Sequence, residues 1–274
     1  MLQIHKPAHP LHRFIEHFVY FEGISAPHNL DRFLPDGNTE IIIDLTECPQ
    51  YIYDNESLQE IQTCRYAWVS GVRTRPITIP SGTGSRMLVI AFKKGKASPF
   101  YRFPINELTD RVIDADLVFG RQFHHLREQL LAADSIPRMF ALCELFLCRQ
   151  AGDALEEDLT TRRIDYAMSS IIHQPSLRSL SHLSDKIGYS QKHFINLFRQ
   201  QVGVPPKQYL RVMRFQKVIC AIEENAVIQW NRVALESGYF DQAHFIHDFK
   251  RLSGFTPNEY LKRKSSVLNY IPVD

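Results

Sequence analysis

The sequence predicts an α+β chain with a jelly-roll-like β domain and trailing helices first, and an all-α domain of two helix-turn-helix units joined by a long helix after it. Three observations support this division. Residues 1–100 alternate short apolar runs with turn sequences, residues 120–151 change to helical periodicity, and everything after Thr161 is helical in period. With 274 residues, 44% of them hydrophobic, the chain is long enough for two domains that each have a core.

The first hundred residues contain six short runs rich in β-branched and aromatic residues. They are FVYFEG, RFLPDGNTEIIIDL, YIYD, RYAWVSGV, RPITIPSG and SRMLVIAFKKG, and PDGN, SGTGS and KKG supply the turns. Strands at this regular spacing predict a β-sandwich or small barrel of the jelly-roll kind. Asp36, Gly37 and Asp44 are expected in a β-hairpin, where turn chemistry explains them.

Two helices are expected between residues 120 and 151. The first places four apolar side chains at i, i+3, i+7 and i+8, namely Phe123, Leu126, Leu130 and Leu131. The second runs from about Arg138 to Arg149 and is nearly all apolar. Four of its side chains are too many to face water: Phe140, Leu142, Phe146 and Leu147. They either cover the β-sheet or pair two chains through helices 120–151, and the sequence leaves both open.

The segment AGDALEEDLT interrupts the helical pattern with glycine and acidic residues. We therefore expect a β-rich domain with two trailing helices over residues 1–151, a linker over 152–160 and the helical domain over 161–265. The net charge of +2 is divided unevenly. Residues 161–274 carry 16 Lys and Arg against 9 Asp and Glu, whereas the rest carries 16 against 21. A basic half of this kind indicates a polyanionic partner.

Other features bear on the compartment. The five cysteines are scattered, which fits reduced thiols in a cytoplasmic protein rather than a disulfide framework. The first residues, MLQIHKPAHPLHRF, are too polar and proline-rich for a signal peptide. No apolar run approaches the ~18 residues of a membrane span.

The helical half contains an internal repeat. GYSQKHFINLFRQQVGVPPKQYL, from Gly188, aligns with GYFDQAHFIHDFKRLSGFTPNEYL, from Gly238, with one extra residue after the second GY. The matches are HFI on HFI, Phe198 on Phe249, Gly203 on Gly254, Pro206 on Pro257, and Tyr209-Leu210 on Tyr260-Leu261. Each unit is a short helix, a turn at glycine and a second helix, which is a helix-turn-helix.

The second helix of the second unit has two different faces. Phe245, Phe249 and Leu252 share one face and are expected in the core, while Gln242, Ala243, His244 and His247 lie away from it. His244 and His247 have a spacing that can chelate a metal. No Asp, Glu or Cys follows at a recognised offset, however, and the first unit has only His193, with Asn196 in place of His247. We therefore expect no metal and favour contact with DNA. The alternative that these are exposed polar positions without a role stays open.

The region from about Ile164 to Lys264 resembles the DNA-binding domain of AraC/XylS-family transcription regulators. The second unit carries ALESGY, HF, DFKR, G, TP and EYL in the order of the family signature. The resemblance implies recognition helices at about Gln191–Gln201 and Asp241–Leu252, fixed relative to each other by a helix from about Pro206 to Glu223. Two such helices are expected to enter successive major grooves about 34 Å apart.

The residues expected near bases are Gln191, Lys192, His193 and Asn196 in the first helix and Gln242, His244 and His247 in the second. Amides can bond adenine bidentately, lysine suits guanine, and imidazole can donate or accept. The residues expected near phosphates, which position the protein on double-stranded DNA, are Arg199, Lys207, Lys250 and Arg251.

The N-terminal stretches RFLPDGNTEIIIDL, SGVRTRP and LVIAFKKGKASPFYRFPINELTD resemble the sensory-type β domain fused to AraC-type DNA-binding domains, especially in bacteria. This resemblance implies a small-molecule effector or a dimerising role. A β domain that only dimerises or binds a protein partner stays open. A cupin-like metabolite enzyme is remote, because His5, His9, His12 and His17 fit no strand face. Glycine phosphate loops, HExxH and GxSxG are absent, so we expect neither catalysis nor a cofactor.

Overall fold

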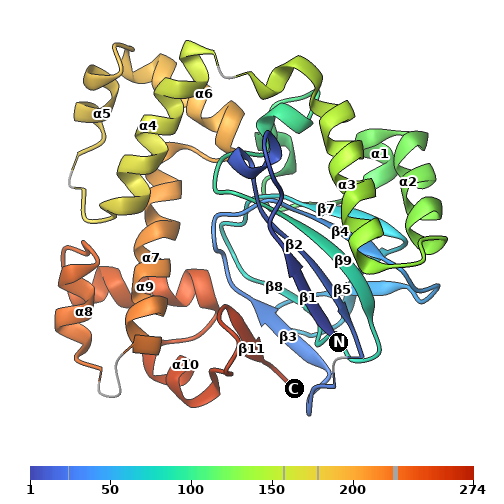
Figure 1. Ribbon diagram of the computed structural model, residues 1–274. Coiled ribbons are helices and arrows are strands. Elements are labelled where there is room, and N and C mark those ends of the chain that lie inside the picture. Colours follow the sequence, from blue (N-terminus) through green and yellow to red (C-terminus); the bar gives the residue numbers. More distant parts are fainter. Residues whose placement is uncertain (24, 157, 178, 225–227) are drawn as a thin grey trace.

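The computed structural model describes residues 1–274 except 24, 157, 178 and 225–227. Its β domain has two antiparallel sheets (Figure 1). The first has the order β1 (Leu2–His5), β2 (Ile15–Glu22), β9 (Arg86–Phe92), β4 (Glu40–Asp44), β7 (Ala67–Ser70) and β10 (Val112–Asp114). The second has the order β11 (Tyr270–Pro272), β3 (Leu30–Phe33), β8 (Ile77–Pro80), β5 (Gln50–Tyr53) and β6 (Glu60–Cys64).

Helices cover one face of the six-stranded sheet. Alternate residues of its central strands, Ile41 and Ile43 in β4 and Leu88 and Ile90 in β9, are buried in one core with these helices. The helices are α1 (Ala115–Phe119), α2 (Arg121–Leu131) and α3 (Ile136–Ala151), and they lie beside β4, β7 and β9 in Figure 1. The two helices expected from periodicity are confirmed, and α1 is an addition.

The apolar face of α3 is buried within one chain. Phe140 and Leu147 are 5% and 0% exposed, and Leu142 and Phe146 pack partly buried against the same core. The sequence had left these four side chains open to a partner chain, and the structure assigns them to the cover of the sheet. The apolar face of α3 therefore gives no support to a homodimer through helices 120–151, and that homodimer stays a prediction.

The expected hairpin around Asp36 is wrong. Strands β3 and β4 belong to different sheets, and the segment between them crosses from one sheet to the other. Asp36 is buried at this crossing, and Gly37, with a φ of +85°, lies against Tyr209 and Met213 of the helical domain. The turn sequence PDGN therefore shapes the contact between the two halves. Asp44 does show turn chemistry, since its carboxylate accepts the N–H of Thr46 at 2.7 Å.

The helical domain contains the two expected units. Its helices are α4 (Leu159–His173), α5 (Ser181–Lys186), α6 (Gln191–Val202), α7 (Pro206–Glu224), α8 (Trp230–Glu236), α9 (Gln242–Ser253) and α10 (Pro257–Arg263). Short 3-10 helices are η1 (Leu11–Arg13), η2 (Ser98–Phe100), η3 (Ile105–Leu108) and η4 (Gly152–Leu155). Both η4 and the start of α4 fall within the predicted linker 152–160, of which residue 157 lies outside the described residues.

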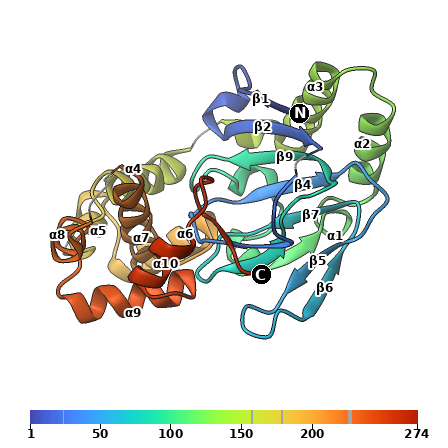
Figure 2. The same ribbon diagram turned by 90° about the horizontal axis from the view of Figure 1, so that it is seen from below.

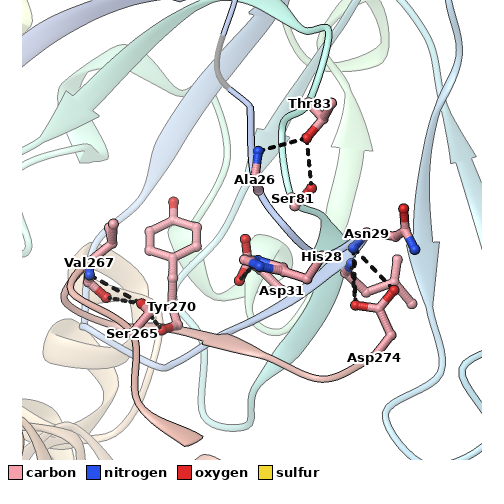
Figure 3. A network of polar contacts seen from close by, with 11 residues as sticks. Ala26, His28, Asn29, Asp31, Ser81, Thr83, Ser265, Val267, Tyr270 and Asp274 are labelled. Carbon is pink, nitrogen blue, oxygen red and sulfur yellow. Dashed lines mark hydrogen bonds and ion pairs between the residues drawn. The ribbon is translucent and has the colours of Figure 1, made fainter.

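The chain after α10 returns to the β domain, which the sequence did not predict (Figures 1 and 2). Strand β11 pairs antiparallel with β3, with Tyr270 opposite Phe33 and Ile271 opposite Arg32. Figure 3 shows the end of this segment, where the Asp274 carboxylate accepts the backbone N–H groups of Asn29 and Leu30 at 3.1 and 2.9 Å. The helical domain is therefore tied to the five-stranded sheet by its own chain.

Side chains of α7 strengthen this contact. Gln216 donates to the Pro35 carbonyl at 2.7 Å and contacts the Asn269 side chain at 2.9 Å. Leu34 and Val72 of the β domain are buried in the core of the helical domain. Among the helices of the described residues, none has the length and hydropathy to span a membrane.

Candidate nucleic-acid interface

Helices α6 and α9 are built alike. Each begins after a side-chain N-cap: the Ser190 hydroxyl accepts the N–H of His193 at 3.4 Å, and the Asp241 carboxylate accepts the N–H of His244 at 2.7 Å. Each ends at a glycine with positive φ, Gly203 at +104° and Gly254 at +82°. The repeat in the sequence is thus a repeat in capping as well as in helix length.

The three apolar side chains predicted for the core face of α9 are buried, and α6 buries two phenylalanines in the same way. Phe194 and Phe198 of α6 and Phe245, Phe249 and Leu252 of α9 are at most 1% exposed. The turn tyrosine of each unit packs edge-on against the histidine at the start of the helix. The ring centroids lie 4.7 Å apart for Tyr189 and His193, and 5.3 Å apart for Tyr239 and His244. Both imidazoles are therefore held by the same kind of contact.

The opposite faces carry the residues expected to read bases. Six of these side chains are exposed and His244 is half-buried; the exposed ones are Gln191, Lys192, His193, Asn196, Gln242 and His247. The four expected phosphate ligands, Arg199, Lys207, Lys250 and Arg251, are also exposed. Lys207 lies in the first turn of α7, while Lys250 and Arg251 lie in the last turn of α9.

A groove of about 490 Å³ lies between the two units. Residues of both units line it, among them Gln191 of α6, Lys207 of α7 and His244 of α9. Three of the residues predicted to contact DNA, from three different helices, therefore share one concave surface.

Two arginines of α7 that the sequence did not assign to the site also line this groove. Arg211 forms an ion pair with Asp248, whose side chain is 3% exposed, at 3.2 Å from Nε to Oδ2. Arg214 donates to the carbonyls of Pro175 and Leu177 at 2.8 and 2.9 Å, and burial lowers its pKa. The signal was available in LRVMR, because arginines at i and i+3 share one helical face.

Asp248 is also the partner of the two histidines that prompted the metal hypothesis. Its carboxylate lies 3.4 Å from Nε2 of His244 and 3.7 Å from Nδ1 of His247. In the part of the chain that the structure describes, no three His, Cys, Asp or Glu residues are grouped so that they could hold a metal ion.

Comparison with known proteins agrees with this geometry. Residues 183–263 match a family model described as a helix-turn-helix domain (HTH_18). Residues 3–114 match a model described as a domain of unknown function (DUF6597).

Curated relatives match over part of their length. An uncharacterized HTH-type transcriptional regulator of Haemophilus influenzae is 29% identical over 110 residues, 39% of this chain. The uncharacterized HTH-type transcriptional regulator YtdP of Bacillus subtilis is 22% identical over 177 residues, 61% of this chain. The chain spans 36% and 23% of the length of these two relatives.

Among solved structures, ToxT from Vibrio cholerae O395 aligns with a TM-score of 0.45 and 10% identity, over 89% of this chain and 97% of that one. The duplicated, equally capped helix-turn-helix units and the match over residues 183–263 lead to one assignment: this part of the chain is an AraC-type helix-turn-helix domain, similar to those of HTH-type transcriptional regulators.

Proposed function

We propose that α6 and α9 read two successive major-groove segments on one face of double-stranded DNA. One observation carries the proposal, namely the two matching helices with buried apolar faces and exposed polar faces, joined through α7. The residues assigned to bases are Gln191, Lys192, His193, Asn196, Gln242, His244 and His247. The residues assigned to phosphates are Arg199, Lys207, Lys250 and Arg251.

The division of labour follows from chemistry and position. Amide and imidazole groups at the start and middle of each helix can bond base edges. The cations at the end of α9 and the start of α7 bind phosphates without reading sequence, so they set register and affinity.

The β domain is proposed to control DNA binding through a small-molecule effector. Its support is the direct contact between the halves, where Gly37 lies against α7 and β11 pairs with β3. A β domain that only dimerises or binds a protein partner is the second candidate, and a cytoplasmic location is part of the same proposal.

Selection from a pool of random DNA duplexes tests the reading function. The full chain should enrich a site with two recognition segments one helical turn, about 34 Å, apart. The logarithm of affinity should fall with the logarithm of salt concentration, with a slope of about −0.9 per phosphate contact. Failure to enrich any sequence, or an affinity insensitive to salt, would contradict the proposal.

A further inference from the structure

A second cavity, of about 610 Å³, lies in the β domain between the sheet-edge strands β6 and β10. Small-molecule sites commonly have volumes of about 300–1,000 Å³. The cavity has an apolar wall formed by Ile52, Ile61, Ile77, Val112 and Leu117. Its charged lining is balanced between three arginines, of which Arg75 and Arg111 are exposed and Arg73 is buried, and three aspartates, Asp54, Asp110 and Asp114.

Arg73 has an incomplete set of partners. Arg73 is 6% exposed, and its Nη1 donates a hydrogen bond to the Asp110 carbonyl at 3.4 Å. Within the described residues, Nε and Nη2 are buried without a hydrogen-bond partner. Burial lowers the pKa of Arg73 to about 10, so the group is still a cation at neutral pH. Burying a cation whose N–H donors have no acceptor costs free energy unless a further acceptor or an anion binds to them.

The nearby acids do not complete it. The Asp110 carboxylate is engaged by Thr74, accepting its N–H at 2.7 Å and its hydroxyl at 2.6 Å. Burial and the Asp36 carboxylate raise the pKa of Glu40 to about 8, so Glu40 is mostly neutral at pH 7. The remaining donors of Arg73 therefore suit an anion that enters from outside.

We propose that this cavity binds a small organic carboxylate, with its carboxylate on Arg73 and its apolar part against Ile52, Ile77 and Val112. A guanidinium fork matches a planar carboxylate bidentately. The apolar wall selects molecules with a hydrocarbon portion over inorganic anions. This inference rests on the proposed effector control and gives the effector a chemical class.

The same loops that hold Arg73 contact helix α6. Thr109, next to Asp110, donates its hydroxyl to the Gly203 carbonyl at 2.6 Å. Val72, next to Arg73, lies against Gly203 together with Ile105 of η3. A side chain at Gly203 would meet Ile105 at 3.2 Å, so the loops fit closely on the C-terminal end of α6. Arg73 is adjacent in sequence to Val72, which contacts the C-terminal glycine of α6. A ligand that moves Arg73 therefore shifts the neighbour of a residue that holds the end of this helix.

Binding is tested by calorimetry on the full chain with straight-chain monocarboxylates of four to twelve carbons and with phenylacetate. At least one should bind, whereas the alcohol of the same length should not. Arg73→Gln should weaken that binding at least tenfold, and Arg73→Lys, which keeps the charge but not the fork, should weaken it less. Arg102→Gln removes an exposed arginine outside the cavity and should leave binding unchanged.

Three outcomes would overturn the site: no carboxylate binds, Arg73→Gln binds as well as the parent, or an alkyl phosphate binds more tightly than its carboxylate. Because Nε and Nη2 of Arg73 have no hydrogen-bond partner and its one bond, to the Asp110 carbonyl, is 3.4 Å long, Arg73→Gln should not lower the thermal midpoint of the ligand-free chain, so a loss of binding would not reflect unfolding.

Control of DNA binding is measured separately. The carboxylate that binds should change the affinity for the selected DNA site by about fivefold or more. Thr109→Val, which removes the hydroxyl bonded to Gly203, should retain carboxylate binding and reduce this change. If the carboxylate binds through Arg73 but leaves DNA affinity unaltered, the anion site stands while effector control fails.

Discussion

Arg211 of α7 is paired with Asp248 of α9, with Nε 3.2 Å from Oδ2. The Asp248 side chain is 3% exposed, so the pair connects α7 to α9 at a point largely removed from water. The same oxygen lies 3.4 Å from Nε2 of His244. One carboxylate therefore fixes both the angle between two helices and the place of an imidazole proposed to read DNA.

Asp248→Ala is expected to lower the free energy of unfolding by about 1.5–3 kcal/mol, because the charged hydrogen-bond acceptor of Arg211 is lost. Urea denaturation measures this. Glu236→Ala is the matched control, since Glu236 pairs with Arg232 at 2.8 Å on the surface, where such a pair contributes about 1 kcal/mol or less. Equal effects of the two substitutions would argue against a structural role for Asp248.

His247→Ala and Gln242→Ala are each expected to cost about 1–3 kcal/mol of binding on the selected DNA site and little on random duplexes, because both side chains are assigned to bases. Fluorescence anisotropy with the two duplexes gives the ratio of affinities. His173→Ala, at the exposed end of α4, is the control. An unchanged ratio for His247→Ala would mean that this face of α9 does not read sequence.

Lys250→Ala is expected to weaken binding to the selected and the random duplex equally, because a phosphate contact carries no sequence information. It should also reduce the slope of log affinity against log salt concentration by about 1. The same anisotropy measurements at several salt concentrations test it. A loss confined to the selected site would move Lys250 from the phosphate group to the base-reading group.

Helices α6 and α9 could be predicted from the sequence because their signals are local. A serine or aspartate cap, phenylalanines four residues apart and a closing glycine all lie within one short helix and its two ends, and they recur in both units. The same holds for the strands with alternating apolar residues, such as Ile41 and Ile43 in β4.

The missed features depend on contacts between distant residues. Strand β11 is three residues long, contains Pro272 and pairs with β3, which precedes it by more than two hundred residues, so no local pattern marks it. From the sequence alone Arg73 is expected at the surface, and only the fold buries it beside Asp110. Asp248 is followed by Phe249 and Lys250, and only the approach of Arg211 explains why an acid lies in the core.

Glu40 predicts a pH dependence of stability. Burial and Asp36 raise its pKa to about 8, against the lowering effect of Arg73, from an ordinary value near 4.5 in the unfolded chain. The folded state therefore holds the proton more tightly, and this contribution to stability is present below pH 4.5 and lost as pH rises through about 8. The free energy of unfolding of Glu40→Gln should fall less than that of the parent between pH 5 and pH 8.5.

The measurement is urea denaturation across that pH range. Glu16→Gln, which replaces an exposed acid of β2, should retain the pH dependence of the parent. Parallel curves for the parent and Glu40→Gln would show that the carboxyl of Glu40 does not titrate in this window.

Strand β11 predicts that the two halves unfold together. Ile271 is 0% exposed and belongs to the core of the helical domain, while its backbone pairs with β3 of the β domain. Ile271→Ala should lower the free energy of unfolding by about 2–5 kcal/mol, because a buried aliphatic side chain is truncated in a packed core. Val267→Ala, at a residue that is 57% exposed, is the control and should have little effect.

Hydrogen exchange locates the change. The N–H of Val273, bonded to the Leu30 carbonyl at 3.1 Å, should exchange faster in Ile271→Ala as the strand loosens. If Ile271→Ala costs no more than Val267→Ala and Val273 exchanges at its former rate, β11 does not stabilise the contact between the halves, and the other contacts, among them those of α7 with Pro35 and Gly37, hold them together.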